Sequence, residues 1–170
     1  MGQLGGNLSM IGTMIWAAAA LAAPDGAPLD LRQPGNVVTA LQAAGYKAEL
    51  KINKAGEPYI LSGANGNSFT LEFYDCEGLK DCGSFQFASW QKKDPVFTAA
   101  LTNEWNAKNR FLRIAVDSDG DLVEYLDATA VGGISQAQFA DLVDWYSVMD
   151  GRLAKFVKEK RDEAKAKPAK

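Results

Sequence analysis

Four strand-like segments follow one another between residues 46 and 91, separated by turns and by one loop that the cysteines flank. In two of these segments apolar side chains recur at every second position, with Phe69, Leu71 and Phe73 in one and Phe85 and Phe87 in the other. Such alternation is typical of antiparallel strands that bury one face. Adjacent strands without intervening helices predict an antiparallel sheet covered by helices, with strands at 46–52, 59–62, 68–74 and 84–91.

Two shorter helices are expected on either side of these strands. The first begins at Asn36, a plausible N-cap, and stops at Gly45, which can adopt the left-handed conformation of a helix end. The second begins at Asp94 as its N-cap, with Pro95 at the first helical position, and ends near Asn109.

A strand pair and a long helix complete the expected order. The segments 110–116 and 122–128 flank "DSDGD", a strong signal for a hairpin. Ser135 and Gln138 fit a capping box at the start of the last helix. The predicted fold is therefore α+β, an antiparallel sheet packed with helices in the order α-β-β-β-β-α-β-β-α. One apolar seam runs along the last helix through Phe139, Leu142, Tyr146, Met149, Leu153 and Phe156.

The amino-terminal residues differ in composition from the rest. An uncharged, alanine-rich run ends in Ala20-Leu21-Ala22, which fits the small-residue pattern before a signal-peptidase cut, although the first basic residue is Arg32. Export to the periplasm or secretion from a bacterium is the leading expectation, with no membrane span after processing. An uncleaved anchor and a cytosolic protein are the alternatives. The expected organisation is a signal peptide (1–22), an extended lead-in (23–35), one α+β domain (36–158) and a charged, fraying tail (159–170).

The composition excludes several kinds of chemistry. The chain has no histidine, so the commonest general base and the commonest metal ligand are both missing. Its formal charge of -3 argues against non-specific binding of nucleic acid. We expect no catalytic residues, no cofactor and no metal, although carboxylate-only or lysine-based catalysis stays open as a third reading.

The "DSDGD" segment also resembles the start of a calcium loop. Asp117, Asp119 and Asp121 occupy its first, third and fifth positions. The sixth position, which needs glycine, is Leu122, and the glycine comes one place early at Gly120. A hairpin turn is therefore the prediction, and a weak cation site is the alternative.

The only two cysteines are Cys76 and Cys82. A structural zinc site needs four ligands, and a thioredoxin-type pair has two residues between its cysteines instead of five. In an exported protein we predict a structural disulfide between two strands. Redox-active thiols and a metal site are the alternatives.

A surface residue of the last helix is a candidate for binding. The apolar seam of this helix could mediate a homodimer, but packing on the sheet requires the same seam. Trp145 lies at its margin and is the candidate interface anchor.

The order of segments resembles the YbjN-domain family, often labelled as bacterial sensory transduction regulators. The resemblance runs from about Asn36 to Phe156 through "LQAAGY", "GEPYILS", "GNSFTLEFYDC", "CGSFQF", "NEWNAKNRFLRIAVDSDGDLVEYLDA" and "GGIS". It implies a fold like that of type III secretion chaperones and a regulatory or protein-binding role. The residues on its most specific motif are Trp105, Asn106, Arg110, Phe111, Asp117, Asp119 and Gly120.

Two roles are open for the first four of these residues. In the structural role, Trp105 and Phe111 pack in the core while Asn106 and Arg110 hold the turn from helix to strand. The alternative is direct binding. For the whole chain we expect an exported, non-enzymatic module that binds another protein. A small-ligand-binding sensory or stress domain of the envelope is the second hypothesis.

Overall fold

A computed structural model describes residues 28–166, so the predicted signal peptide (1–22) lies outside the described residues, as do residues 167–170. Within residues 28–166 the elements follow the predicted order and confirm the α+β class. Their bounds are α1 (Pro34–Ala43), β1 (Glu49–Ile52), β2 (Pro58–Ala64), β3 (Asn67–Tyr74), β4 (Ser84–Gln91), α2 (Ala99–Lys108), β5 (Arg113–Val116), β6 (Leu122–Thr129) and α3 (Gln136–Ala166).

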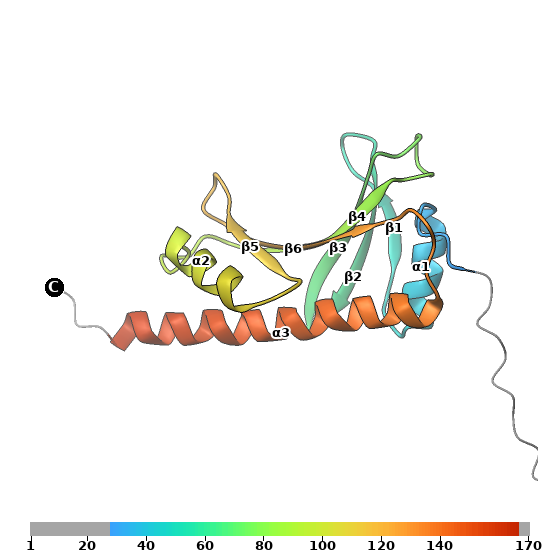
Figure 1. Cartoon of the computed structure of the whole chain (residues 1–170). Coiled ribbons are helices and arrows are strands. Elements are labelled where there is room, and N and C mark those ends of the chain that lie inside the picture. The colour runs from blue at the N-terminus through green and yellow to red at the C-terminus, as the bar shows by residue number, and fades with distance from the viewer. Residues whose placement is uncertain (1–27, 167–170) are drawn as a thin grey trace, which may run out of the picture.

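The six strands form one antiparallel sheet in the order β1-β2-β3-β4-β6-β5. Figure 1 shows α3 running along one face of the curved sheet, from α1 beside β1 at one end to α2 beside β5 at the other. The sheet and α3 therefore form two layers, and the core lies between them. None of the helices in the described part of the chain has an apolar stretch that would cross a bilayer.

The strand alternation supplies one side of this core. Leu71 pairs with Phe87 and Phe73 pairs with Phe85 in the β3–β4 register, and all four side chains are buried. Tyr146 of α3 packs from the other side, with its ring stacked on Phe87 at a centroid distance of 5.0 Å. The alternating aromatics and the helical seam predicted from the sequence thus face each other.

Both short helices begin at residues other than the predicted N-caps. Helix α1 begins at Pro34, because proline suits the first helical turn, and Asn36 instead donates a hydrogen bond to the carbonyl of Asp30. Helix α2 begins at Ala99, with the Thr98 hydroxyl accepting a hydrogen bond from the Leu101 amide at 3.2 Å.

The predicted N-cap Asp94 forms a separate turn before α2. One of its carboxylate oxygens accepts a hydrogen bond from the Val96 amide at 3.0 Å, and its carbonyl accepts one from the Phe97 amide at 2.9 Å. Aspartate followed by proline favours such a turn as much as it favours a helix start. The second carboxylate oxygen accepts a hydrogen bond from Arg161 of α3 at 2.8 Å.

The last helix begins as predicted and continues further than predicted. The Ser135 hydroxyl accepts a hydrogen bond from the Gln138 amide, and the Gln138 side chain accepts one from the Ser135 amide, so the capping box is confirmed. Residues 159–166, expected to fray, are helical instead. Lys160 pairs with Glu104 of α2 at 2.9 Å, so charged side chains attach this segment to the domain.

The two cysteines are joined in a disulfide that closes the loop between β3 and β4. Cys82 is fully buried, and its amide donates a hydrogen bond to the Arg32 carbonyl at 3.0 Å. The Gln33 amide group also donates to the Asp81 carboxylate at 2.8 Å. The loop therefore holds the segment before α1 against the end of the sheet.

Candidate functional site

Two of the motif residues attach α2 to β5. Trp105 is buried, and its indole N–H donates a hydrogen bond to the Leu112 carbonyl at 3.1 Å. The Asn106 side chain donates to the Ile114 carbonyl at 2.9 Å and accepts from the Ile114 amide at 3.1 Å. These bonds satisfy backbone groups at the edge of the sheet and fix the course of the chain between helix and strand.

Arg110 and Phe111, the other two of the first four motif residues, lie on the surface beside Trp145, the candidate anchor on α3. Phe111 is 42% exposed and Trp145 is 38% exposed, with their ring centroids 4.8 Å apart. The guanidinium of Arg110 lies 5.0 Å from the centre of the Phe111 ring. Val148, 40% exposed, is three residues beyond Trp145 on the same side of α3. We call these four residues the aromatic cluster.

The expectation that Phe111 packs in the core is therefore wrong, and backbone geometry explains why. The Leu112 amide donates a hydrogen bond to the Arg110 carbonyl at 2.9 Å, which closes a three-residue turn around Phe111. Phe111 has a φ of 65°, a left-handed conformation that bulky side chains rarely adopt. This turn buries Leu112 and directs the Phe111 ring outward onto Trp145.

The remaining motif residues form the β5–β6 hairpin turn. The Asp117 carboxylate accepts hydrogen bonds from the amides of Asp119 and Asp121 at 3.0 and 2.9 Å. Gly120, with a φ of 84°, donates its amide hydrogen to the Asp117 carbonyl. The Asp121 carboxylate accepts from Lys92, which together with the Lys93 amide lowers the pKa of Asp121. Within residues 28–166 no cluster of carboxylates or cysteines has the arrangement of a metal site.

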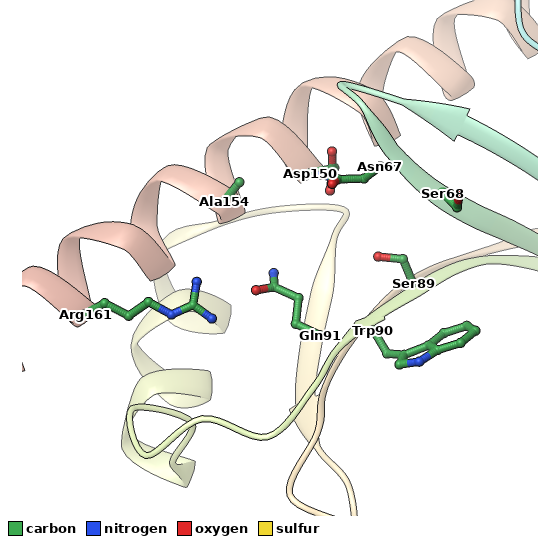
Figure 2. Close-up of a pocket in the computed structure, with 8 residues that line it drawn as sticks. All are labelled: Asn67, Ser68, Ser89, Trp90, Gln91, Asp150, Ala154 and Arg161. Carbon is green, nitrogen blue, oxygen red and sulfur yellow. The ribbon is translucent and has the colours of Figure 1, made fainter.

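A cavity of about 540 Å³ lies between the end of β4 and the middle of α3. Figure 2 shows Ser89 and Gln91 of β4 facing the side of α3 that carries Asp150 and Arg161, while the Trp90 indole turns away from them. Most of the lining residues are polar or charged, although they belong to the layer that the core occupies elsewhere. This combination sets the region apart from the rest of the interface between sheet and helix.

A buried glutamate is hydrogen-bonded to the lining residue Ser89 and to Tyr146 of α3. Glu124 of β6 is 3% exposed, and its Oε1 accepts hydrogen bonds from the Ser89 hydroxyl at 2.6 Å and the Tyr146 hydroxyl at 3.0 Å. Its Oε2 is buried without a hydrogen-bond partner. Burial, together with the negative charge of Asp150, raises the pKa of Glu124 to about 7.

Asp150 is itself nearly buried, and the two carboxyl groups lie within hydrogen-bonding reach of each other. Its Oδ2 accepts a hydrogen bond from the Asn65 side chain at 2.9 Å. Sequence reasoning missed this site, although a signal was present. Leu122, Glu124 and Leu126 share one face of the β6 segment, so the alternation already placed a carboxylate among buried side chains.

Comparison with known proteins gives one family and no individual relative. Searches of curated proteins and of solved structures returned no match. The model of the family YbjN, described as "Putative bacterial sensory transduction regulator", matches residues 33–149. This match covers α1, the whole sheet, α2 and the first part of α3; it includes the aromatic cluster and Glu124 and ends one residue before Asp150. The chain belongs to the YbjN family.

Proposed function

We propose that this YbjN domain is a non-enzymatic module that binds another protein through its aromatic cluster. The observation that carries the proposal is the exposed stack of Phe111 on Trp145. A left-handed backbone at a bulky residue costs on the order of 1–3 kcal/mol and recurs at functional positions. A turn that only linked α2 to β5 could avoid this cost with glycine at position 111.

The chemistry of the cluster indicates the kind of surface that it fits. Tryptophan and arginine are enriched among the residues that dominate binding energy at protein interfaces. Phe111, Trp145 and Val148 offer apolar area, and the Arg110 guanidinium lies at their side. A partner with an exposed apolar side chain next to an acidic one would complement this arrangement.

The test uses two variants of the cluster and a matched control. Phe111→Gly removes the ring from a position whose backbone suits glycine, and Trp145→Ala removes the second ring. Trp90→Ala is the control, because Trp90 is a 56% exposed tryptophan on β4 outside the cluster. The immobilised proteins are incubated with envelope extract, and retained proteins are quantified by mass spectrometry.

We expect at least one protein to be retained by the wild type and by Trp90→Ala and to be lost from both cluster variants. Retention of the same proteins by all four forms would overturn the proposal. Sedimentation velocity on the same set tests a homodimer. A dimer that only the cluster variants lose would identify a second copy of the chain as the partner.

The alternative function, binding of a small ligand, is favoured by the polar cavity beside Asp150. Native mass spectrometry of freshly isolated protein tests it, since a retained molecule would appear as a constant added mass. Loss of that mass in Gln91→Leu, together with unchanged capture of proteins, would favour the ligand-binding function.

Export to an oxidising compartment is the third part of the proposal, and the Cys76–Cys82 disulfide is compatible with it. The intact mass of protein from an envelope fraction should correspond to a chain cleaved near Ala22 and lacking two hydrogens. A full-length chain recovered from the cytosol with both thiols free would refute export.

A further inference from the structure

The unpartnered oxygen of Glu124 needs an explanation, because buried polar atoms in folded proteins nearly always have hydrogen-bond partners. Oε1 of the same carboxyl group has two donors, Ser89 and Tyr146. The other titratable group that acts on Glu124 as a charge and as a hydrogen-bonding partner is the Asp150 carboxyl, which is another acceptor when ionised. Two ionised carboxylates would leave Oε2 both unpaired and next to a like charge.

One proton resolves this arrangement. If Oε2 of Glu124 carries a hydrogen, it can donate a hydrogen bond to Asp150, and every polar atom of Glu124 then has a partner. Carboxyl groups in contact in a buried site share a proton for the same reason in other proteins. Because Glu124 belongs to β6 and Asp150 to α3, the shared proton joins the two layers of the domain.

The groups around Glu124 come from three elements, and Asp150 is also bonded by Asn65 in the turn between β2 and β3. On α3, Asp150 and Tyr146 face Glu124, and Tyr146 remains a donor because burial raises its pKa well above the ordinary value. The neighbours across the sheet, Ser89 on β4 and Ile114 on β5, carry no charge. Arg161 also lines the adjacent cavity, but its guanidinium pairs with Asp94.

We propose that the Glu124–Asp150 pair is a pH-responsive tie between β6 and α3, closed by one shared proton and opened when that proton leaves. Opening places two negative charges beside a cavity that water can enter, so the middle of α3 separates from the sheet first. The inference goes beyond the proposed function and does not depend on a partner.

The composition makes the effect easy to isolate. Histidine is the usual source of charge changes between pH 5 and 8, and this chain has none. Both cysteines are in the disulfide and do not titrate. Among the side chains of residues 28–166, Glu124 is the one whose pKa is shifted into this interval, to about 7.

Linkage fixes the sign of the pH dependence. The pKa of Glu124 is higher in the folded protein than the ordinary 4.5 of an unfolded chain, so the folded state holds more protons between these values. The contribution of Glu124 to stability is therefore fully present below pH 4.5 and is lost as the pH rises through 7. The unfolding equilibrium constant should rise roughly 70-fold between pH 5 and 8, given a pKa of about 7.

The decisive variant is Glu124→Gln, whose carboxamide reproduces the protonated acid. Its N–H can donate to Asp150 while its oxygen accepts from Ser89 and Tyr146. Urea unfolding from pH 5 to 8 should show a declining midpoint for the wild type and a nearly constant one for Glu124→Gln. Asp144→Asn, which neutralises an exposed carboxylate of α3, is the control and should decline like the wild type. A wild-type midpoint that stays constant, or a decline that persists in Glu124→Gln, overturns the inference.

A second measurement covers the case in which Glu124→Gln does not fold. The side-chain carboxyl carbon of Glu124 is followed by NMR from pH 4 to 9 in the wild type and in Asp150→Asn. We expect titration near neutral pH in the wild type and at clearly lower pH in Asp150→Asn, because the like charge is gone. Titration of Glu124 near pH 4 in the wild type would refute the tie. The urea midpoints and the NMR titration do not depend on the capture experiment. They would stand even if the cluster variants retained the same proteins as the wild type.

Discussion

Trp145 and Tyr146 are neighbours on α3, and their surroundings differ completely. Trp145 is 38% exposed and lies against Phe111. Tyr146 is 1% exposed, stacks on Phe87 and donates a hydrogen bond to Glu124. The two aromatic residues thus belong to two different sides of one helix, the outer side with the aromatic cluster and the inner side with the core and the acid pair.

The difference means that one helix contributes to stability on its inner side and, under the proposed function, to binding on its outer side. On the inner side, burial of aromatic area against the sheet stabilises the fold. On the outer side, a strained turn keeps a phenylalanine in water, where it adds nothing comparable to the core. Changes on the inner side should therefore alter stability, and changes on the outer side should alter binding.

The largest expected effect comes from comparing two single variants, one that truncates Tyr146 and one that truncates Trp145. Tyr146→Ala leaves a cavity under α3 and removes a donor from Glu124, so it should lower the free energy of unfolding by about 4 kcal/mol. Trp145→Ala removes a largely exposed ring and should cost less than about 1 kcal/mol. Urea unfolding at pH 6 measures both. Equal losses of unfolding free energy would show that the two sides of α3 do not differ in their contribution to stability.

Removing the disulfide should also lower stability, through a loop that belongs to neither side of α3. The double variant Cys76→Ser with Cys82→Ser opens a short loop, which should cost about 2 kcal/mol by the chain-entropy model. Thermal unfolding followed by circular dichroism measures this loss, and the reduced wild type serves as a comparison. Partner capture should persist. If capture disappears while the protein stays folded, the β3–β4 loop also takes part in binding.

Two substitutions of Phe111 separate strain from contact. Both Phe111→Gly and Phe111→Ala remove the ring, but only glycine adopts a φ of 65° without strain. The glycine variant should therefore be more stable than the alanine variant by about 1 kcal/mol, as measured by urea unfolding. Both should lose the partner equally. A glycine variant no more stable than alanine would mean that the turn carries no strain.

The smallest effect is expected for Tyr146→Phe, which keeps the ring and removes one hydroxyl. At pH 5 it should cost about 0.5 kcal/mol, because Oε1 of Glu124 retains the hydrogen bond from Ser89. The Tyr146 hydrogen bond lowers the pKa of Glu124, so its loss should raise that pKa further. The decline in stability should then start near pH 4.5, as in the wild type, and continue to a higher pH than in the wild type. NMR titration of Glu124 detects the shift, and an unchanged pKa would contradict the hydrogen bond.

The sequence was sufficient to predict the sheet and the order of the elements. Alternation at Phe69, Leu71 and Phe73 reports directly on which side chains share a face, and that face is buried here. The start of α3 was equally readable, because Ser135 and Gln138 interact over one turn of chain. Features that depend on local spacing are within reach of sequence reasoning.

Features that depend on distant partners could not be predicted from the sequence. Phe111 has the pattern of a strand residue, and nothing in its neighbours shows that hydrogen bonds from Trp105 and Asn106 hold the following residues and turn it outward. Glu124 could be placed on the inner face, but its pKa depends on the extent of its burial and on Asp150, 26 positions further along the chain. Lys160 likewise stays helical through an ion pair with Glu104.

The position of α3 also has a consequence for folding during synthesis. All six strands precede α3, and most pair with the strand before or after them in sequence, so hairpins can form as the chain emerges. Their apolar face nevertheless stays open to water until the 31 residues of α3, about 46 Å of helix, are available to cover it. A nascent chain that ends before α3 should keep this apolar face exposed, so that chaperones or a translocation machinery can bind it. The domain can therefore complete its folding only after α3, which carries both Trp145 and Tyr146, has been synthesised.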